Sequence, residues 1–146
     1  MTKYVIDAEV ALALAARDAA IPQQHRLLAP TLLRSQVLAK LFADVQSGRL
    51  GRREADRRLD HLRALRIRLL GDRVLQRVAW QVAADLGWKD TYAAEYVALT
   101  KLQADALVTR DRSLAKAVRG LVAVATIDEL LSRAPGTPAG GTSGRR

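Results

Sequence analysis

The chain has 146 residues, no cysteine, and 24 lysine and arginine residues against 15 acidic ones, which gives a formal net charge of +9. This length suits one domain with a single hydrophobic core. The lack of cysteine excludes disulfides and thiolate zinc sites and fits a cytoplasmic location. Charges interrupt every apolar run before about 18 residues and no signal-peptide pattern is present, so we expect no membrane contact. The positive charge favours a polyanion, such as nucleic acid, as the partner.

Short apolar runs alternate with helical patterns through the first two thirds of the chain. Such runs are typical of strands that are buried on both faces. Proline and glycine residues mark several of the limits between elements. The predicted elements are a strand over 3–7, a helix over about 8–20, a strand or extended segment over 27–30, helices over 31–47 and 52–65, a strand over 67–70 and a helix over 72–86.

The last third of the chain is organised around the run from 90 to 111. Its first part repeats apolar residues at spacings of three and four, which predicts a helix whose core face holds Tyr92, Tyr96, Leu99 and Leu102. Residues 106–109 are continuously apolar up to Thr109 and predict a buried strand. The remaining predicted elements are a short helix over 113–118, a strand over 121–125 and a helix over 127–132.

Strands interleaved with helices predict an α/β fold with three α/β/α layers and a mainly parallel central sheet. We assign this domain to residues 1–133. Residues 134–146 consist mostly of glycine, proline and small polar residues and have nothing to bury. They are therefore predicted to form a disordered tail.

Two predicted strands end close to an aspartate, Asp7 in the first case and Asp111 in the second. Parallel strands bring such ends to one edge of the sheet, where ligands bind in α/β proteins. Asp90, which opens a helix, supplies a third acidic position. Clustered carboxylates without cysteine favour Mg²⁺ or Mn²⁺ over zinc. The alternative for each aspartate is an ordinary helix cap that accepts free amide hydrogens.

Residues 49–77 form the basic centre of the sequence, with ten arginines against four acidic residues. This excess predicts a surface that contacts RNA phosphates or an acidic segment of a partner protein. The alternative is a solvated helical face with internal ion pairs, such as Glu54 with Arg58 and Asp56 with Arg57.

The histidines and tryptophans carry weaker signals. His25 and His61 are isolated in the sequence, and we expect both at the surface. Trp80 and Trp88 belong to or follow a helical pattern with a core-like face, so we expect both to pack in the core rather than stack on bases.

Four segments together resemble the PIN-domain family, and within it the VapC-type toxins of bacterial toxin-antitoxin pairs. The resemblance spans residues 3–131 in matching order. It implies a metal-dependent endoribonuclease that binds Mg²⁺ or Mn²⁺, is inhibited by a cognate antitoxin protein, and forms a homodimer. The segments are YVIDAEVAL, LLAPTLLRSQVLAKLF, DTYAAEYVALTKLQADALVTRD and RSLAKAV.

Only part of the family's acidic set is present. Asp7 matches the first acid of the family and Asp111 the last, whereas Gln36 stands where a Glu is usual and Ala93 where an Asp is usual. Asp90 lies one helical turn before Ala93 and is the candidate third ligand beside Asp7 and Asp111. Glu95 falls about 200° around the helix from Ala93, so we expect it to point elsewhere.

The resemblance therefore leaves two functions open. The first is an endoribonuclease toxin, including a form inactivated by an Asp-to-Ala change at Ala93. The second is a catalytically silent relative that binds RNA or an antitoxin without cutting.

Overall fold

The computed structural model describes residues 1–132, which form five strands and seven helices. The predicted tail, 134–146, lies outside the described residues. In chain order, the elements are β1 (Thr2–Ile6), α1 (Ala8–Ala16), β2 (His25–Pro30), α2 (Leu32–Gln46), α3 (Arg52–Ala64), β3 (Arg68–Leu70), α4 (Arg73–Asp85), α5 (Tyr92–Gln103), β4 (Ala106–Val108), α6 (Arg112–Val118), β5 (Val124–Ala125) and α7 (Ile127–Leu131).

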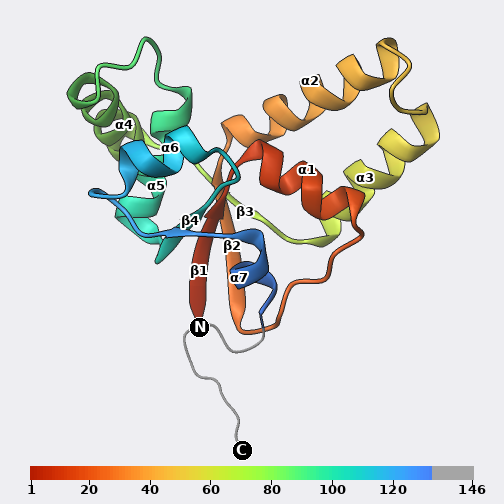
Figure 1. Ribbon diagram of the computed structural model, residues 1–146, viewed down its shortest axis with the longest axis horizontal. Helices are drawn as coiled ribbons and strands as arrows, with labels where there is room; N and C mark the ends of the chain where they lie inside the picture. Colours follow the sequence, from red (N-terminus) through yellow and green to blue (C-terminus); the bar gives the residue numbers. More distant parts are fainter. Residues whose placement is uncertain (133–146) are drawn as a thin grey trace, which may run out of the picture.

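The five strands form one parallel sheet in the order β3-β2-β1-β4-β5. Helices α1 to α3 lie on one side of this sheet and α4 to α6 on the other, which gives the predicted three α/β/α layers (Figure 1). Strand order reverses direction between β1 and β4, and this kind of switch point is where open α/β sheets bind ligands.

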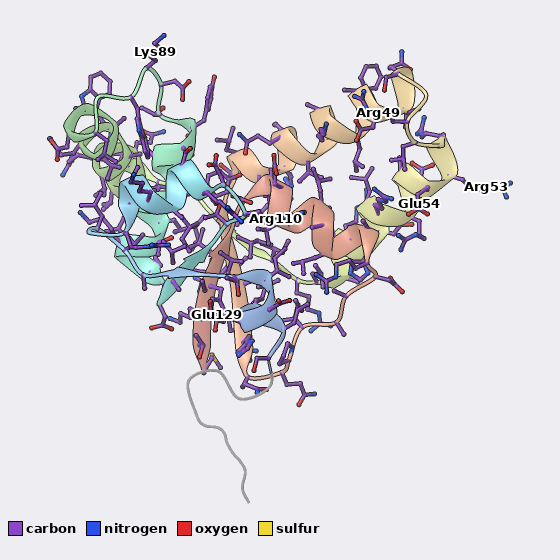
Figure 2. The ribbon with its side chains drawn as sticks, viewed as in Figure 1. Arg49, Arg53, Glu54, Lys89, Arg110 and Glu129 are labelled. Carbon is purple, nitrogen blue, oxygen red and sulfur yellow. The ribbon has the colours of Figure 1, made fainter. Side chains whose placement is uncertain are left out.

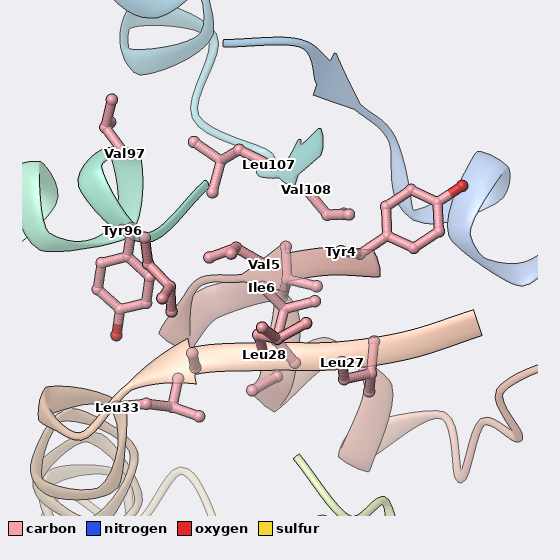
Figure 3. Packing of buried hydrophobic residues seen from close by; sticks show 14 of the residues in the cluster. Tyr4, Val5, Ile6, Leu27, Leu28, Leu33, Tyr96, Val97, Leu107 and Val108 are labelled. Atoms are coloured by element: carbon pink, nitrogen blue, oxygen red, sulfur yellow. The ribbon is translucent and has the colours of Figure 1, made fainter. Parts of the chain in front are cut away.

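The core lies on both faces of the two central strands. Val5 and Ile6 of β1 and Leu107 and Val108 of β4 have no exposed surface. Figure 3 shows these four side chains together with buried residues of β2 and α5. Strand segments covered on both faces need apolar residues at every position, which explains the unbroken apolar runs over 4–6 and 106–108.

Polar side chains just before several helices bind the free backbone amides at the helix start. Asp7, Asp72 and Asp111 each accept a hydrogen bond from a backbone amide of the helix that follows. Thr126 and Glu129 form a reciprocal capping box at α7. Gly48 and Gly87 have positive φ angles of 80° and 69°, a conformation that favours glycine after a helix.

Several expected limits and exposures are wrong. The first helix ends at Ala16 rather than near 20, because the chain turns through Asp18 at a φ of 53°. The last strand shortens to Val124–Ala125. Two of the four apolar residues predicted for the core face of α5 are exposed instead, namely Tyr92 and Leu102.

The expectations for His25 and Trp80 are wrong, and the expectation for Trp88 is confirmed. His25 is buried at 4% exposure and its Nδ1 donates a 2.7 Å hydrogen bond to the Leu130 carbonyl, so it is not a surface residue. Trp80 is 73% exposed and does not pack in the core, whereas Trp88 does pack against it. No helix formed within residues 1–132 combines the length and apolar character needed to cross a membrane.

Candidate functional site at the carboxyl edge of the sheet

Asp7 directly follows β1 and is held by hydrogen bonds on both of its oxygens. Its Oδ1 accepts from the Val10 amide at 2.9 Å, and its Oδ2 accepts from the Thr109 hydroxyl at 2.8 Å. Thr109 follows β4 at the position that continues the pairing of Ile6 with Val108. The adjacent parallel strands thus place a carboxylate and a hydroxyl side by side at the switch point of the sheet.

Asp111 lies two residues beyond Thr109 on the same edge. Its backbone amide donates to the Thr109 hydroxyl oxygen at 3.1 Å, and its Oδ1 accepts from the Leu114 amide at 3.0 Å. One threonine hydroxyl therefore connects Asp7 with the residue that carries the second carboxylate. The expectation that β1 and β4 end at one edge of the sheet is confirmed.

The charge of Asp7 is unfavourable in this position. Burial raises the pKa of Asp7 above its usual range, while hydrogen bonds from Val10 and Thr109 lower it in part. The negative charges of Glu9 and Asp111 raise the pKa further. Asp7 and Asp111 therefore lie close enough to repel each other, and a bound cation would relieve that repulsion.

Asp90 and Ala93 face Asp111 across a hollow of about 330 Å³. Ser113 and Trp88 also line this hollow. Asp90 Oδ1 accepts from the Tyr92 amide at 3.2 Å, so the aspartate satisfies the start of α5 and lines the hollow at the same time. The two sequence interpretations of Asp90, helix start and site residue, are compatible. Ala93 is half-buried and its small side chain lines the hollow.

Gln36 reaches the site region through Tyr96. The Tyr96 hydroxyl donates to Gln36 Oε1 at 2.5 Å, and Figure 3 shows this hydroxyl pointing from α5 toward α2. Burial raises the pKa of the Tyr96 phenol, and the charges of Asp7 and Glu95 add to the effect. Tyr96 thus lies within the electrostatic reach of Asp7. The Gln36 oxygen therefore already accepts a hydrogen bond.

Thr109 and Tyr96 are the contributors that sequence reasoning missed. The sequence pattern predicts Thr109 only as the end of a strand and Tyr96 only as part of the core face of a helix. The available signal was Thr109 itself, a buried hydroxyl at the strand end next to the Asp7 strand. Glu95 does not line the hollow, as expected, but its charge raises the pKa of Tyr96.

The candidate ligands are oxygen atoms of the type that a hard cation prefers, but too few of them lie together. Asp7, Asp111 and Asp90 supply oxygen ligands, which Mg²⁺ and Mn²⁺ prefer. Within residues 1–132, however, no three His, Asp or Glu side chains gather closely enough to hold a metal ion. Gln36 and Ala93 stand where the resemblance expects the additional carboxylates.

Half of the arginines in residues 49–77 are already paired. Glu54 accepts hydrogen bonds from Arg57 and Arg58, which lower its pKa to about 2. The expected pair of Glu54 with Arg58 is confirmed. That of Asp56 with Arg57 is wrong, because Arg57 contacts Glu54 and Asp18 and Asp56 contacts Arg52. The paired arginines are Arg49, Arg52, Arg57, Arg58 and Arg63.

No family model matches this chain, and no curated protein matches it. Among solved structures, it is similar to a crystal structure of PAE2754 from Pyrobaculum aerophilum, at 28% sequence identity and a TM-score of 0.70. The match covers 89% of this chain and 87% of the other, so the two share the α/β fold over nearly their whole lengths.

Proposed function

We propose that this chain is a metal-dependent endoribonuclease of the PIN-domain, VapC-toxin type, with activity reduced by Gln36 and Ala93. The observation that carries the proposal is the pair Asp7 and Asp111 at adjoining strand ends, connected through one buried threonine hydroxyl. A raised pKa at Asp7, caused in part by Asp111, supports a cation at this edge.

In this proposal each residue of the site has its own role. Asp7 is fixed on both oxygens and provides the rigid anchor for a cation, while Asp111 and Asp90 provide more exposed oxygens across the hollow. A bound Mg²⁺ or Mn²⁺ supplies a more acidic water and neutralises charge on a phosphate. Thr109 holds Asp7 in position, and exposed arginines attract and orient the RNA backbone.

The partners belong to the same proposal. RNA is the substrate, a cognate antitoxin is the inhibitor, and a homodimer in the cytoplasm is the working form. The net charge of +9 supports binding to RNA or to an acidic antitoxin segment.

A catalytically silent RNA- or antitoxin-binding protein is the second candidate. It is favoured by the absence, within the described part of the chain, of three grouped metal-ligating side chains. The Tyr96 hydrogen bond that occupies the Gln36 oxygen also favours it.

The substitution Ala93→Asp separates the two candidates. It adds a carboxylate to the hollow that Asp90 and Asp111 line, in the first turn of α5, where backbone amides favour an anion. We expect the variant to cleave a structured RNA with Mn²⁺ or Mg²⁺ and to bind Mn²⁺ on the order of tenfold more tightly. The measurement is RNA cleavage by gel assay beside calorimetric Mn²⁺ titration.

Ala93→Asn is the matched control, since it has nearly the same size without the charge and should stay inactive. Chelator, or a second substitution Asp7→Asn, should abolish cleavage. If Ala93→Asp binds metal but cuts no RNA, whereas Gln36→Glu cuts, then Gln36 marks the missing ligand. If no variant cuts, the silent binding protein is the better assignment.

A further inference from the structure

A second cavity, of about 720 Å³, lies beside the candidate site on the other side of Asp111. Its walls come from the end of α1, the β4–α6 connection, α6, and the segment from β5 into α7. Asp111 lines both this cavity and the hollow that contains Asp90 and Ala93. A ligand in the cavity would therefore contact Asp111, one of the three candidate metal ligands.

Four arginines surround this cavity, namely Arg17, Arg110, Arg112 and Arg119. All four are exposed. None of their guanidinium groups makes a hydrogen bond or an ion pair with another residue of the described chain. Arg110 lies centrally, between α1 and α6 (Figure 2). The donors of this cluster are therefore free for an anionic ligand.

The acidic residues of the cavity only partly offset this charge. They are Asp111, Asp128 and Glu129. Asp111 and Glu129 already accept hydrogen bonds from backbone amides, at Leu114 and Thr126 respectively. The four guanidinium groups outnumber the three carboxylates, so the cavity carries a net positive charge that no internal ion pair of the described residues neutralises.

Between the arginines the cavity wall is apolar and made of small side chains. Ala13, Ala115, Ala125 and Ile127 contribute to it, and Ala16 lines it at the last turn of α1. An apolar wall of small side chains leaves room for a flat base beside guanidinium donors that can hold its phosphate, and the volume lies in the range of small-ligand sites.

We propose that this cavity holds one nucleotide of the RNA strand, with its base on the small apolar wall and its phosphate on the arginines. The inference takes RNA as the ligand and to that extent rests on the proposed function. It moves the main phosphate contact away from residues 49–77. There, half of the arginines are paired, and Arg53 extends outward from α3, as Figure 2 shows.

The test is binding of a fluorescently labelled single-stranded RNA octamer in excess chelator, measured by anisotropy at several salt concentrations. The double variant Arg110→Gln/Arg119→Gln should bind more weakly, and its logarithmic salt slope should fall by about 1.4, since each lost phosphate contact removes about 0.7 for single strands. The matched control Arg53→Gln/Arg77→Gln removes the same charge from two other exposed, unpaired arginines and should weaken binding far less, with a much smaller change of slope.

A third variant tests the apolar wall without changing charge. Ala16→Leu fills part of the cavity and should weaken binding while the salt slope stays the same. Melting curves confirm that each variant is folded. Equal losses in the two arginine pairs, no loss in the cavity pair, or no binding of the octamer by the wild-type chain would overturn the proposal.

Cleavage is measured separately, so the two proposals can fail independently. If Ala93→Asp cuts RNA but the cavity variants bind normally, the nuclease assignment stands and the nucleotide cavity is wrong. If the cavity variants lose binding and no variant cuts, the cavity stands and the nuclease assignment fails.

Discussion

The Thr109 hydroxyl forms hydrogen bonds with two residues of the site. It donates to Asp7 Oδ2 and accepts from the Asp111 amide. Because the hydroxyl is buried, Thr109→Val would leave the Asp7 oxygen without its donor. We expect a loss of about 1–3 kcal/mol in the free energy of unfolding at neutral pH, measured by urea denaturation. Thr91→Val is the control, since the Thr91 side chain caps no amide, and it should change stability little.

The pH dependence of this effect has a definite sign. The folded-state pKa of Asp7 is raised, so ionised Asp7 costs stability as the pH rises through that pKa. Removing the Thr109 donor makes the ionised form less favourable still. The difference between wild type and Thr109→Val should therefore shrink in acid, and a constant difference would show that the valine acts only through packing.

The pH dependence of stability expected for Glu54 has the opposite sign to that for Asp7. Arg57 and Arg58 lower its pKa from 4.5 to about 2, so its contribution is present above about pH 4.5 and is lost as the pH falls toward 2. Glu54→Gln should lower the melting temperature modestly at pH 7, with the difference disappearing across that interval. Because the pairs are partly exposed, 1 M NaCl should also reduce the difference at pH 7. A difference that persists at pH 2 would assign the effect to packing.

At the scale of elements, the central strands were the most predictable part of the fold. The last three residues of β1 and all of β4 are buried, and such segments show as continuous apolar runs. β5 was overestimated because Leu121 and Val122 continue the apolar pattern, although they belong to a turn after α6. His25 was missed because its partner, the Leu130 carbonyl, lies 105 residues later and depends on the docking of α7.

Helix α4 shows that large apolar residues of one helix can differ widely in burial. Leu75 is 3% exposed and Trp80 is 73% exposed, although both are large and apolar. We expect Leu75→Ala to cost about 2–5 kcal/mol through the cavity it leaves. Trp80→Ala should change stability by less than about 0.5 kcal/mol. Urea denaturation of both variants checks this contrast, and a large loss at Trp80 would mean that another molecule covers it.

The sequence predicts the edge of the sheet at which the site lies but not the contacts within the site. Two aspartates after short apolar strands sufficed to place Asp7 and Asp111 on one edge. The bonds that define the site join residues 102 apart, Asp7 and Thr109, and 60 apart, Gln36 and Tyr96. Such contacts depend on strand order and on the packing of α5 against the sheet, which local periodicity does not encode.

Metal affinity can be tested on the whole molecule, because a ligand that binds only the folded state raises the melting temperature. If the proposed function is right, Gln36 and Ala93 stand in place of two carboxylates beside Asp7 and Asp111, and we expect a millimolar dissociation constant for Mn²⁺. At 10 mM Mn²⁺ that gives a stabilisation of at most about 1.4 kcal/mol, whereas a micromolar site would give about 5 kcal/mol. In a chain of this size the first corresponds to a shift of only about 3–6 °C.

The control for this measurement must distinguish the site from general charge screening. Asp60 is exposed on α3 and pairs with Arg63, far along the chain from the sheet edge. Asp60→Asn should keep the small Mn²⁺ shift, whereas Asp7→Asn should lose it, because Asp7 is the only carboxylate of the described site that is fixed on both oxygens. A shift far above 6 °C in the wild-type chain would show that Asp90 and Gln36 complete the site without the missing acids. Equal shifts in both variants would place the ion elsewhere on the protein.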